Sequence, residues 1–296
     1  MCRRQGGSYR LAKGGTVALL KGTGLLEKSL EDKSVTVSWS EFSSGPPLLE
    51  ALAAGALDFG TTGDVPPLFA HASGGDLEFV GAYEGSALGS AILVHKDSGI
   101  ATLADLKGKK LAFKRGSSAH NIALQLLRTV GLTLEEVEAV DLTPPDAGPA
   151  FANGSIDAWS IWDPYTAITE ALPDTVTLAS ADGVVPSYGF FSANTGFAQD
   201  NPDLVKGIIK KLQKAGKAAQ NDLDGTVKAF AEATGLPEDI LKVVATRKGQ
   251  NYGALGYVEG KHITYEQGLA DDFFAQGIIP VKLDIKSKVW TPSSNS

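Results

Sequence analysis

Short apolar runs rich in β-forming residues alternate with helical patterns through the first two thirds of the chain. Helical spacing of apolar residues predicts helices over 46–54, 65–72, 117–130, 147–153 and 165–172. Strands are predicted over 35–39, 77–82, 91–95, 110–113, 138–142, 158–161, 175–179 and 189–193. Alternation of strands and helices indicates an α/β fold with largely parallel sheets.

The pattern changes at Asn201, where the strand signals stop. Four helices are predicted over 202–220, 224–234, 237–247 and 264–276. A short extended segment is expected around Val289 and Trp290. The last third of the chain is therefore predicted to be mainly helical.

One stretch of the chain is echoed 99 residues later. The run ALAAGALDF at 51–59 resembles AFANGSIDA at 150–158, with glycine at 55 and 154 and aspartate at 58 and 157. Each copy reads as a helix that ends at a glycine and continues into a strand. We interpret the echo as two lobes of similar build, with a generic helix-to-strand pattern as the alternative.

Composition and charge exclude several classes of protein. The net charge of −7 argues against a general nucleic-acid binder, because phosphate neutralisation requires a basic surface. The single cysteine, Cys2, excludes a disulfide framework and a multi-cysteine metal site. The four histidines are dispersed without metal-binding spacing, so we expect no metal ion and no cofactor.

Localisation signals are sparse. No apolar run reaches the roughly 18–20 residues of a membrane-spanning helix. The basic residues at the start are not followed by an apolar segment, so we expect no complete signal peptide within this sequence. The chain is interpreted either as cytosolic or as the mature or truncated form of an exported protein.

Small polar turns precede several of the predicted helices. They lie at 14–16, 43–45, 61–64, 116–118 and 162–163. A helix N-terminus offers free N–H groups and a partial positive charge, so such turns are able to bind an anion. Ordinary helix capping is the alternative at each one. Nucleotide-binding, zinc-protease and serine-hydrolase motifs are absent from the sequence, which favours binding over catalysis.

Three runs contain such turns, and two of them also contain proline. They are GTTGDVPPLFA at 60–70, KRGSSAH at 114–120 and DAWSIWDPY at 157–165. These runs resemble the aliphatic sulfonate-binding proteins of ABC importers, over nearly the whole chain. The run DLKGK at 105–109 is shared with a wider set that includes taurine, nitrate and thiamine-precursor binders.

The resemblance implies a fold and a division into lobes. It implies a two-lobed periplasmic-binding-protein fold of type 2, in which each lobe is a mixed sheet flanked by helices and two crossover strands join the lobes. Lobe 1 is expected to comprise 1–94 and 193–296, and lobe 2 to comprise 95–192. A small sulfonate would bind in the cleft between the lobes, and the closed form would dock on an ABC permease.

The resemblance also implies a set of ligand contacts. Thr16, Ser117 and Ser118 would hold the sulfonate oxygens, and Trp162 and Tyr188 would line the organic tail. Asp64 and Asp163 would accept from the tail, reject dianions by repulsion, or cap helices. His120 would either donate to the anion or sit neutral on a helix face. The full set is Gly14, Gly15, Thr16, Ser44, Thr62, Gly63, Asp64, Ser117, Ser118, His120, Trp162, Asp163 and Tyr188.

Three features depart from the family pattern, and one of them is the missing signal peptide described above. The expected first strand, at 8–12, contains few β-formers apart from Tyr9 and is predicted to be weak. The loop at 83–90 carries an acidic residue, Glu84, near the expected cleft. Tail specificity is therefore expected to differ from that of the family.

The function expected from the resemblance is capture of a small organosulfonate by a monomeric, periplasmic binding protein. The alternatives are another small anion, such as nitrate, taurine, a thiamine-type pyrimidine, or a cofactor-free enzyme on the same scaffold. Neither nucleic acid nor a metal ion is an expected partner.

Overall fold

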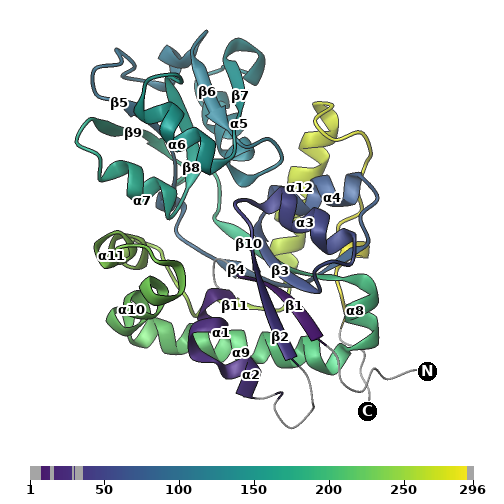
Figure 1. The fold of residues 1–296 in the computed structure, drawn as a ribbon. Helices are drawn as coiled ribbons and strands as arrows, with labels where there is room; N and C mark the ends of the chain where they lie inside the picture. Colours follow the sequence, from purple (N-terminus) through teal and green to yellow (C-terminus); the bar gives the residue numbers. More distant parts are fainter. Residues whose placement is uncertain (1–7, 14–16, 29, 31–35, 292–296) are drawn as a thin grey trace. The chain divides into compact units, whose positions relative to one another are not determined.

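The computed structural model describes residues 8–13, 17–28, 30 and 36–291 (Figure 1). The chain forms two compact units. The first comprises Met1–Glu84, Tyr188–Gly235 and Tyr252–Ser296, and the second comprises Gly85–Ser187 and Leu236–Asn251. The lobe boundaries expected after residues 94 and 192 stay a prediction. The chain passes from the first compact unit to the second after Glu84 and returns after Ser187. The second unit also includes the later segment Leu236–Asn251.

The first unit is built on a six-stranded mixed sheet. Its strand order is β11-β4-β10-β3-β1-β2. β1 runs parallel to β2 and β3, whereas β10 is antiparallel to β3 and β4. The strands are β1 (Ser8–Lys13), β2 (Thr36–Glu41), β3 (Phe59–Gly63), β4 (Leu77–Glu84), β10 (Tyr188–Asn194) and β11 (Leu255–Gly256).

The second unit is built on a five-stranded mixed sheet of order β7-β6-β8-β5-β9. β6 is parallel to β7 and β8, and β5 is antiparallel to β8 and β9. The strands are β5 (Ser90–His95), β6 (Lys110–Phe113), β7 (Glu138–Asp141), β8 (Ala158–Trp162) and β9 (Thr175–Ser180). Two mixed sheets flanked by helices confirm the predicted fold class.

The described helices fall into the same two groups. In the second unit they are α5 (Ser118–Arg128), α6 (Pro144–Ala152), α7 (Tyr165–Glu170) and α11 (Glu238–Thr246). In the first unit they are α1 (Ala18–Thr23), α2 (Leu25–Lys28), α3 (Gly45–Ala53), α4 (Val65–Ala72), α8 (Thr195–Asp200), α9 (Pro202–Asn221), α10 (Leu223–Thr234) and α12 (Gly260–Ala275). No described helix is long and apolar enough to cross a bilayer.

Alternation along β8 places a helix on each face of the second sheet. The hydroxyl of Ser160 donates to the carbonyl of Ala119 in α5, at 2.9 Å. Its neighbours Trp159 and Ile161 point the other way and share a buried cluster with Phe151 of α6. The first four residues of β8 are buried between the two helices, which explains why apolar residues stand on both sides of Ser160.

The sequence echo corresponds to a repeated backbone clamp. In the first unit, the N–H of Asp58 donates to the carbonyl of Arg10, and the N–H of Arg10 donates to the Asp58 carboxylate at 2.7 Å. In the second unit, Asp157 makes the same pair of contacts with Lys110, its carboxylate accepting at 2.8 Å. Each aspartate thus ties the start of its strand, β3 or β8, to the strand beside it.

The clamp also explains why the first strand forms. β1 is predicted to be weak, yet it pairs with β2 along six consecutive residues. The guanidinium of Arg10 adds an ion pair with Asp58 at 2.8 Å. Contacts with residues far along the chain therefore outweigh the poor β-propensity of this segment.

Candidate functional site

In the first unit, three of the predicted residues lie at one edge of the sheet. β3 ends at Gly63, which is paired with Gly189 of the antiparallel strand β10. Tyr188, the first residue of β10, therefore lies beside the end of β3, where Asp64 follows. Tyr265 of α12 joins them, because its hydroxyl donates to the Asp64 carboxylate at 2.8 Å and its ring meets Tyr188 edge to face at 5.3 Å.

Asp64 is buried and acts as a helix cap. One carboxylate oxygen accepts from the N–H of Val65, the first residue of α4, at 3.0 Å. The other accepts from Tyr265. Glu266, the next residue in α12, is fully buried, and burial raises its pKa well above its usual range, with the Asp64 charge acting in the same direction.

Ser44 and Thr62 flank the same end of β3. Ser44 is the N-cap residue of α3 and is buried, with no hydrogen-bond partner for its hydroxyl among the described residues. The next residue, Gly45, permits a close approach, since a Cβ there would lie 2.3 Å from Pro66 and 3.3 Å from the Thr62 methyl. The predicted residues Gly14, Gly15 and Thr16 lie outside the described residues.

In the second unit, Ser117 and Ser118 stand at the N-terminus of α5. Ser117 is buried, and its hydroxyl donates to the carbonyl of Lys114 at 2.7 Å. Its proton is thus used within the turn. Ser118 is half-buried, and no described residue hydrogen-bonds to its hydroxyl or to the N–H groups of Ser118 and Ala119. These donors are available to an anion.

His120 packs as a neutral side chain. Its ring stacks on Phe113 at 5.1 Å, and its Nδ1 accepts from the N–H of Gly116 at 3.4 Å. Burial lowers the pKa of His120 to about 4, and the Arg115 charge contributes. At neutral pH the ring therefore carries no charge, so it offers an anion no electrostatic attraction.

Trp162 and Asp163 close β8. Trp162 is half-buried and meets Tyr165 edge to face at 6.3 Å, and its apolar atoms pack on the cluster beneath α6. The Asp163 carboxylate accepts from the N–H of Ala167 in the first turn of α7, at 3.1 Å. Asp163 therefore accepts from one N–H in the first turn of α7, whose N-cap position is held by Pro164.

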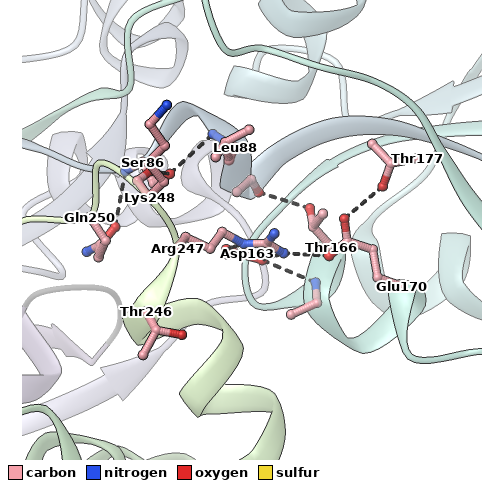
Figure 2. A network of polar contacts seen from close by, with 12 residues as sticks. Ser86, Leu88, Asp163, Thr166, Glu170, Thr177, Thr246, Arg247, Lys248 and Gln250 are labelled. Atoms are coloured by element: carbon pink, nitrogen blue, oxygen red, sulfur yellow. Dashed lines mark hydrogen bonds and ion pairs between the residues drawn. The ribbon is translucent and has the colours of Figure 1, made fainter.

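Asp163 is also held by Arg247, which follows α11 (Figure 2). The arginine Nε and Nη2 donate to the two carboxylate oxygens at 2.5 and 3.0 Å, and Nη2 also reaches Glu170 at 2.7 Å. Both side chains of the Asp163–Arg247 pair are about nine-tenths buried, with 15% and 11% exposed. The Asp163 oxygen that accepts from Nε also faces Gly89, where a Cβ would lie only 2.5 Å from it.

Ser86 fixes the loop after Arg247 in the same way. Its hydroxyl donates to the carbonyl of Lys248 at 2.7 Å, and its N–H donates to the side chain of Gln250 at 3.1 Å (Figure 2). Both backbone and side-chain groups thus connect the segment 236–251 to the rest of the second unit.

Comparison with known proteins places the chain in a family. A family model described as NMT1/THI5 like matches residues 34–224, which is more than half of the chain. The chain belongs to the NMT1/THI5-like family. Within it, a relative from Escherichia coli (strain K12), provisionally named an aliphatic sulfonates-binding protein, is 34% identical over 277 residues, covering 94% of this chain and 86% of the relative.

Two solved structures resemble the chain over nearly all its length. The alkanesulfonate-binding protein SsuA from Xanthomonas axonopodis pv. citri, bound to MOPS, matches with a TM-score of 0.90 and 33% identity, covering 98% of this chain and 99% of that one. The periplasmic aliphatic sulphonate binding protein SsuA from Escherichia coli matches with a TM-score of 0.84 and 33% identity, covering 96% and 97%. The resemblance identified in the sequence is confirmed.

Three residues that contact the predicted site residues were not themselves predicted from the sequence. Arg247 follows a helix, and nothing nearby signals a buried partner. Tyr265 and His262 are spaced by three in the run KHITYE, so they share a face of α12 and meet Tyr188 there. That spacing is the local sequence signal that could have indicated these two residues.

Glu84, the predicted source of altered specificity, is neutralised within the first unit. It ends β4 and forms an ion pair with Lys261 of α12. His262 lies 3.8 Å from the same carboxylate. Among the described residues, no group of three or more His, Cys, Asp and Glu side chains could hold a metal ion.

Proposed function

We propose that this chain is the substrate-binding component of an ABC importer, and that it captures a small aliphatic sulfonate and delivers it to a membrane permease. The observation that carries the proposal is identity of about one third, over more than nine tenths of the chain, to proteins named for binding aliphatic sulfonates or alkanesulfonates. We further propose that it acts as a monomer, outside the cytoplasmic membrane, and does no chemistry on its ligand.

The N-terminus of α5 supplies the anion contacts in this proposal. Ser118 offers a hydroxyl and two adjacent N–H groups are free, and the helix places its partial positive charge behind them. A sulfonate is anionic at all working pH values, so fixed neutral donors suit it. His120 is neutral at pH 7 and adds no positive charge. In this proposal the uncharged donors alone discriminate between a sulfonate and a divalent anion.

The remaining contacts follow the division into units. From the second unit, Trp162 presents an exposed part of its ring to the organic tail. From the first unit, Ser44, Thr62, Gly63 and Tyr188 contribute, together with Gly14, Gly15 and Thr16. Asp64 and Asp163 act as helix caps in this proposal and shape the turns that hold the ligand.

A thermal-shift panel tests the proposed function. Ethane-, butane- and octanesulfonate, taurine, sulfate, nitrate and a thiamine pyrimidine are each added in a sulfonate-free buffer. A ligand at 100-fold above its dissociation constant adds about 2.7 kcal/mol, which raises Tm by several degrees. Stabilisation by the alkanesulfonates alone is expected; stabilisation by nitrate or the pyrimidine instead would overturn the ligand class. Mass spectrometry of each mixture detects turnover, which would contradict the binding-only proposal.

Two neighbouring serines give a matched pair of variants. Ser118→Ala removes a free donor, so we expect sulfonate affinity to fall about 10-fold or more, with little change in the stability of the unliganded protein. Ser117→Ala removes a hydroxyl whose proton is already used by Lys114, so its main effect is expected on stability. Equal affinity losses, or none in Ser118→Ala, would contradict the anion site at α5.

A further inference from the structure

The exposed face of α9 is strongly basic, although the protein as a whole is acidic. Lys210, Lys214 and Lys217 are exposed on this 20-residue helix, and Lys206 and Lys211 are half-buried. The acidic residue within the helix, Asp203, stands in its first turn and pairs with Lys206 at 3.8 Å. Among the described residues, none forms an ion pair with the three exposed lysines.

Helical geometry gathers these three lysines into one stripe. At 3.6 residues per turn, positions 210, 214 and 217 lie within about 60° of arc. The opposite face is buried against the first unit through Val205, Ile208, Ile209, Leu212, Ala215, Gly216 and Ala219. α9 runs as one continuous helix (Figure 1), so the stripe is straight and is carried on a fixed support.

The composition of the stripe selects its partner. Protein interfaces are enriched in aromatic residues and arginine and depleted in lysine, and α9 contains neither aromatic residues nor arginine. Lysine is a hydrated point charge that makes no demand on partner geometry. A row of such charges suits a fluid layer of lipid phosphates better than a shaped acidic pocket.

We propose that the lysine stripe of α9, formed by Lys210, Lys214 and Lys217, adsorbs the protein to a bilayer that contains anionic lipid. None of the large exposed apolar side chains belongs to α9 within the described part of the chain, so the contact is electrostatic, without insertion. The net charge of −7 does not prevent it, because at about 0.1 M salt charges farther than roughly 10 Å are screened. The proposal does not depend on the proposed function.

Vesicle co-sedimentation of the full chain, without ligand, tests this surface. The probes are phosphatidylcholine vesicles with and without roughly one quarter phosphatidylglycerol, at about 50 mM and about 500 mM salt. Binding is expected only with phosphatidylglycerol and only at low salt. Absence of binding to these vesicles, or equal binding to pure phosphatidylcholine, overturns the proposal.

A pair of variants with equal charge assigns the contact to α9. The triple variant Lys210→Gln, Lys214→Gln, Lys217→Gln is expected to weaken binding about 100-fold, since each lysine near an anionic surface contributes about fivefold. The matched control is Lys110→Gln, Lys282→Gln, Lys286→Gln, three exposed lysines outside α9. Its binding is expected to stay within about threefold of the unmodified chain. Equal losses in the two variants would show that general charge, or another surface, is responsible.

Discussion

The guanidinium of Arg247 spans both carboxylate oxygens of Asp163, although the two residues are 84 positions apart in the chain. The pair joins the loop after α11 to the turn before α7. Asp163 directly follows Trp162, so the same pair positions a residue proposed to contact the ligand. The stability of the turn and the position of Trp162 are therefore expected to depend on a distant arginine.

Removing Arg247 leaves Asp163 and Glu170 without their shared cation in a mostly buried setting. Arg247→Ala is expected to lower the free energy of unfolding by about 3 kcal/mol, the usual cost of breaking a buried pair from one side. Arg128→Ala, at the exposed end of α5, serves as control and is expected to cost about 0.5 kcal/mol or less. Urea unfolding at pH 7 measures both, and equal losses would show that the Arg247 pair adds no stability.

Gly89 is expected to be essential for the same pair. A Cβ there would lie 2.5 Å from one Asp163 carboxylate oxygen and 3.1 Å from its carboxyl carbon. Gly89→Ala should therefore displace Asp163 and cost about 1–3 kcal/mol. In the Arg247→Ala background the cost should be smaller, because Asp163 is then free to move.

A second glycine gives the control for this substitution. A Cβ at Gly268 of α12 meets no atom within 4 Å. Gly268→Ala is expected to gain about 0.5–1 kcal/mol from helix propensity. A harmless Gly89→Ala, with thermal unfolding unchanged, would show that the turn accommodates the methyl group and that the close contact has no energetic consequence.

Sequence patterns predicted the strands that consist of a continuous apolar run. β5 and β6 were predicted from apolar runs, and both form. β3, with the sequence FGTTG, was indicated only by the echo and not by its apolar pattern. Two glycines and two threonines give no apolar alternation, even though four of its five residues are buried. α12 begins at Gly260, before the predicted start at 264, because Glu259 and His262 form a capping box.

The candidate site was predictable only in part, for a similar reason. The turns before α4, α5 and α7 carry local signals, namely glycine and small polar residues ahead of an apolar helix. Their partners come from far along the chain: Tyr265 reaches Asp64 across 201 residues, and Arg247 reaches Asp163 across 84. Periodicity and capping rules describe neighbours in sequence, so they contain no information on such pairs.

The repeated clamp predicts unequal effects at its two aspartates. Asp58 is buried and holds both the N–H and the guanidinium of Arg10, whereas Asp157 is half-buried and holds the N–H of Lys110. Asp58→Ala is expected to cost about 2–3 kcal/mol, and Asp157→Ala about 1 kcal/mol.

Amide hydrogen exchange localises the effect of the clamp. Asp58→Ala should speed exchange at the N–H of Arg10 and leave Lys110 unchanged, and Asp157→Ala should do the reverse. Unchanged exchange at both amides would contradict the clamp as the anchor of β3 and β8.

His71 is expected to make the protein sensitive to mild acid. It lies in α4, with its ring 5.4 Å from that of Phe79 and with no hydrogen-bond partner for either ring nitrogen among the described residues. Burial lowers its pKa from 6.5 to about 4, and the Lys288 charge contributes. The unfolded chain therefore binds a proton between about pH 6.5 and pH 4 that the folded chain excludes, so stability falls as the pH drops through this window.

A comparison at two pH values isolates the contribution of His71. At pH 5 the expected loss from this residue is about 2 kcal/mol relative to pH 7.5. His71→Leu removes the titrating group and fills similar space, so the variant should lose about 2 kcal/mol less than the unmodified chain over the same interval. His120, whose pKa is also about 4, remains in both proteins and cancels in the comparison. Urea unfolding of each protein at both pH values gives the double difference in the free energy of unfolding. A value near zero would mean that His71 binds its proton as readily in the folded chain as in the unfolded chain, which would contradict the prediction.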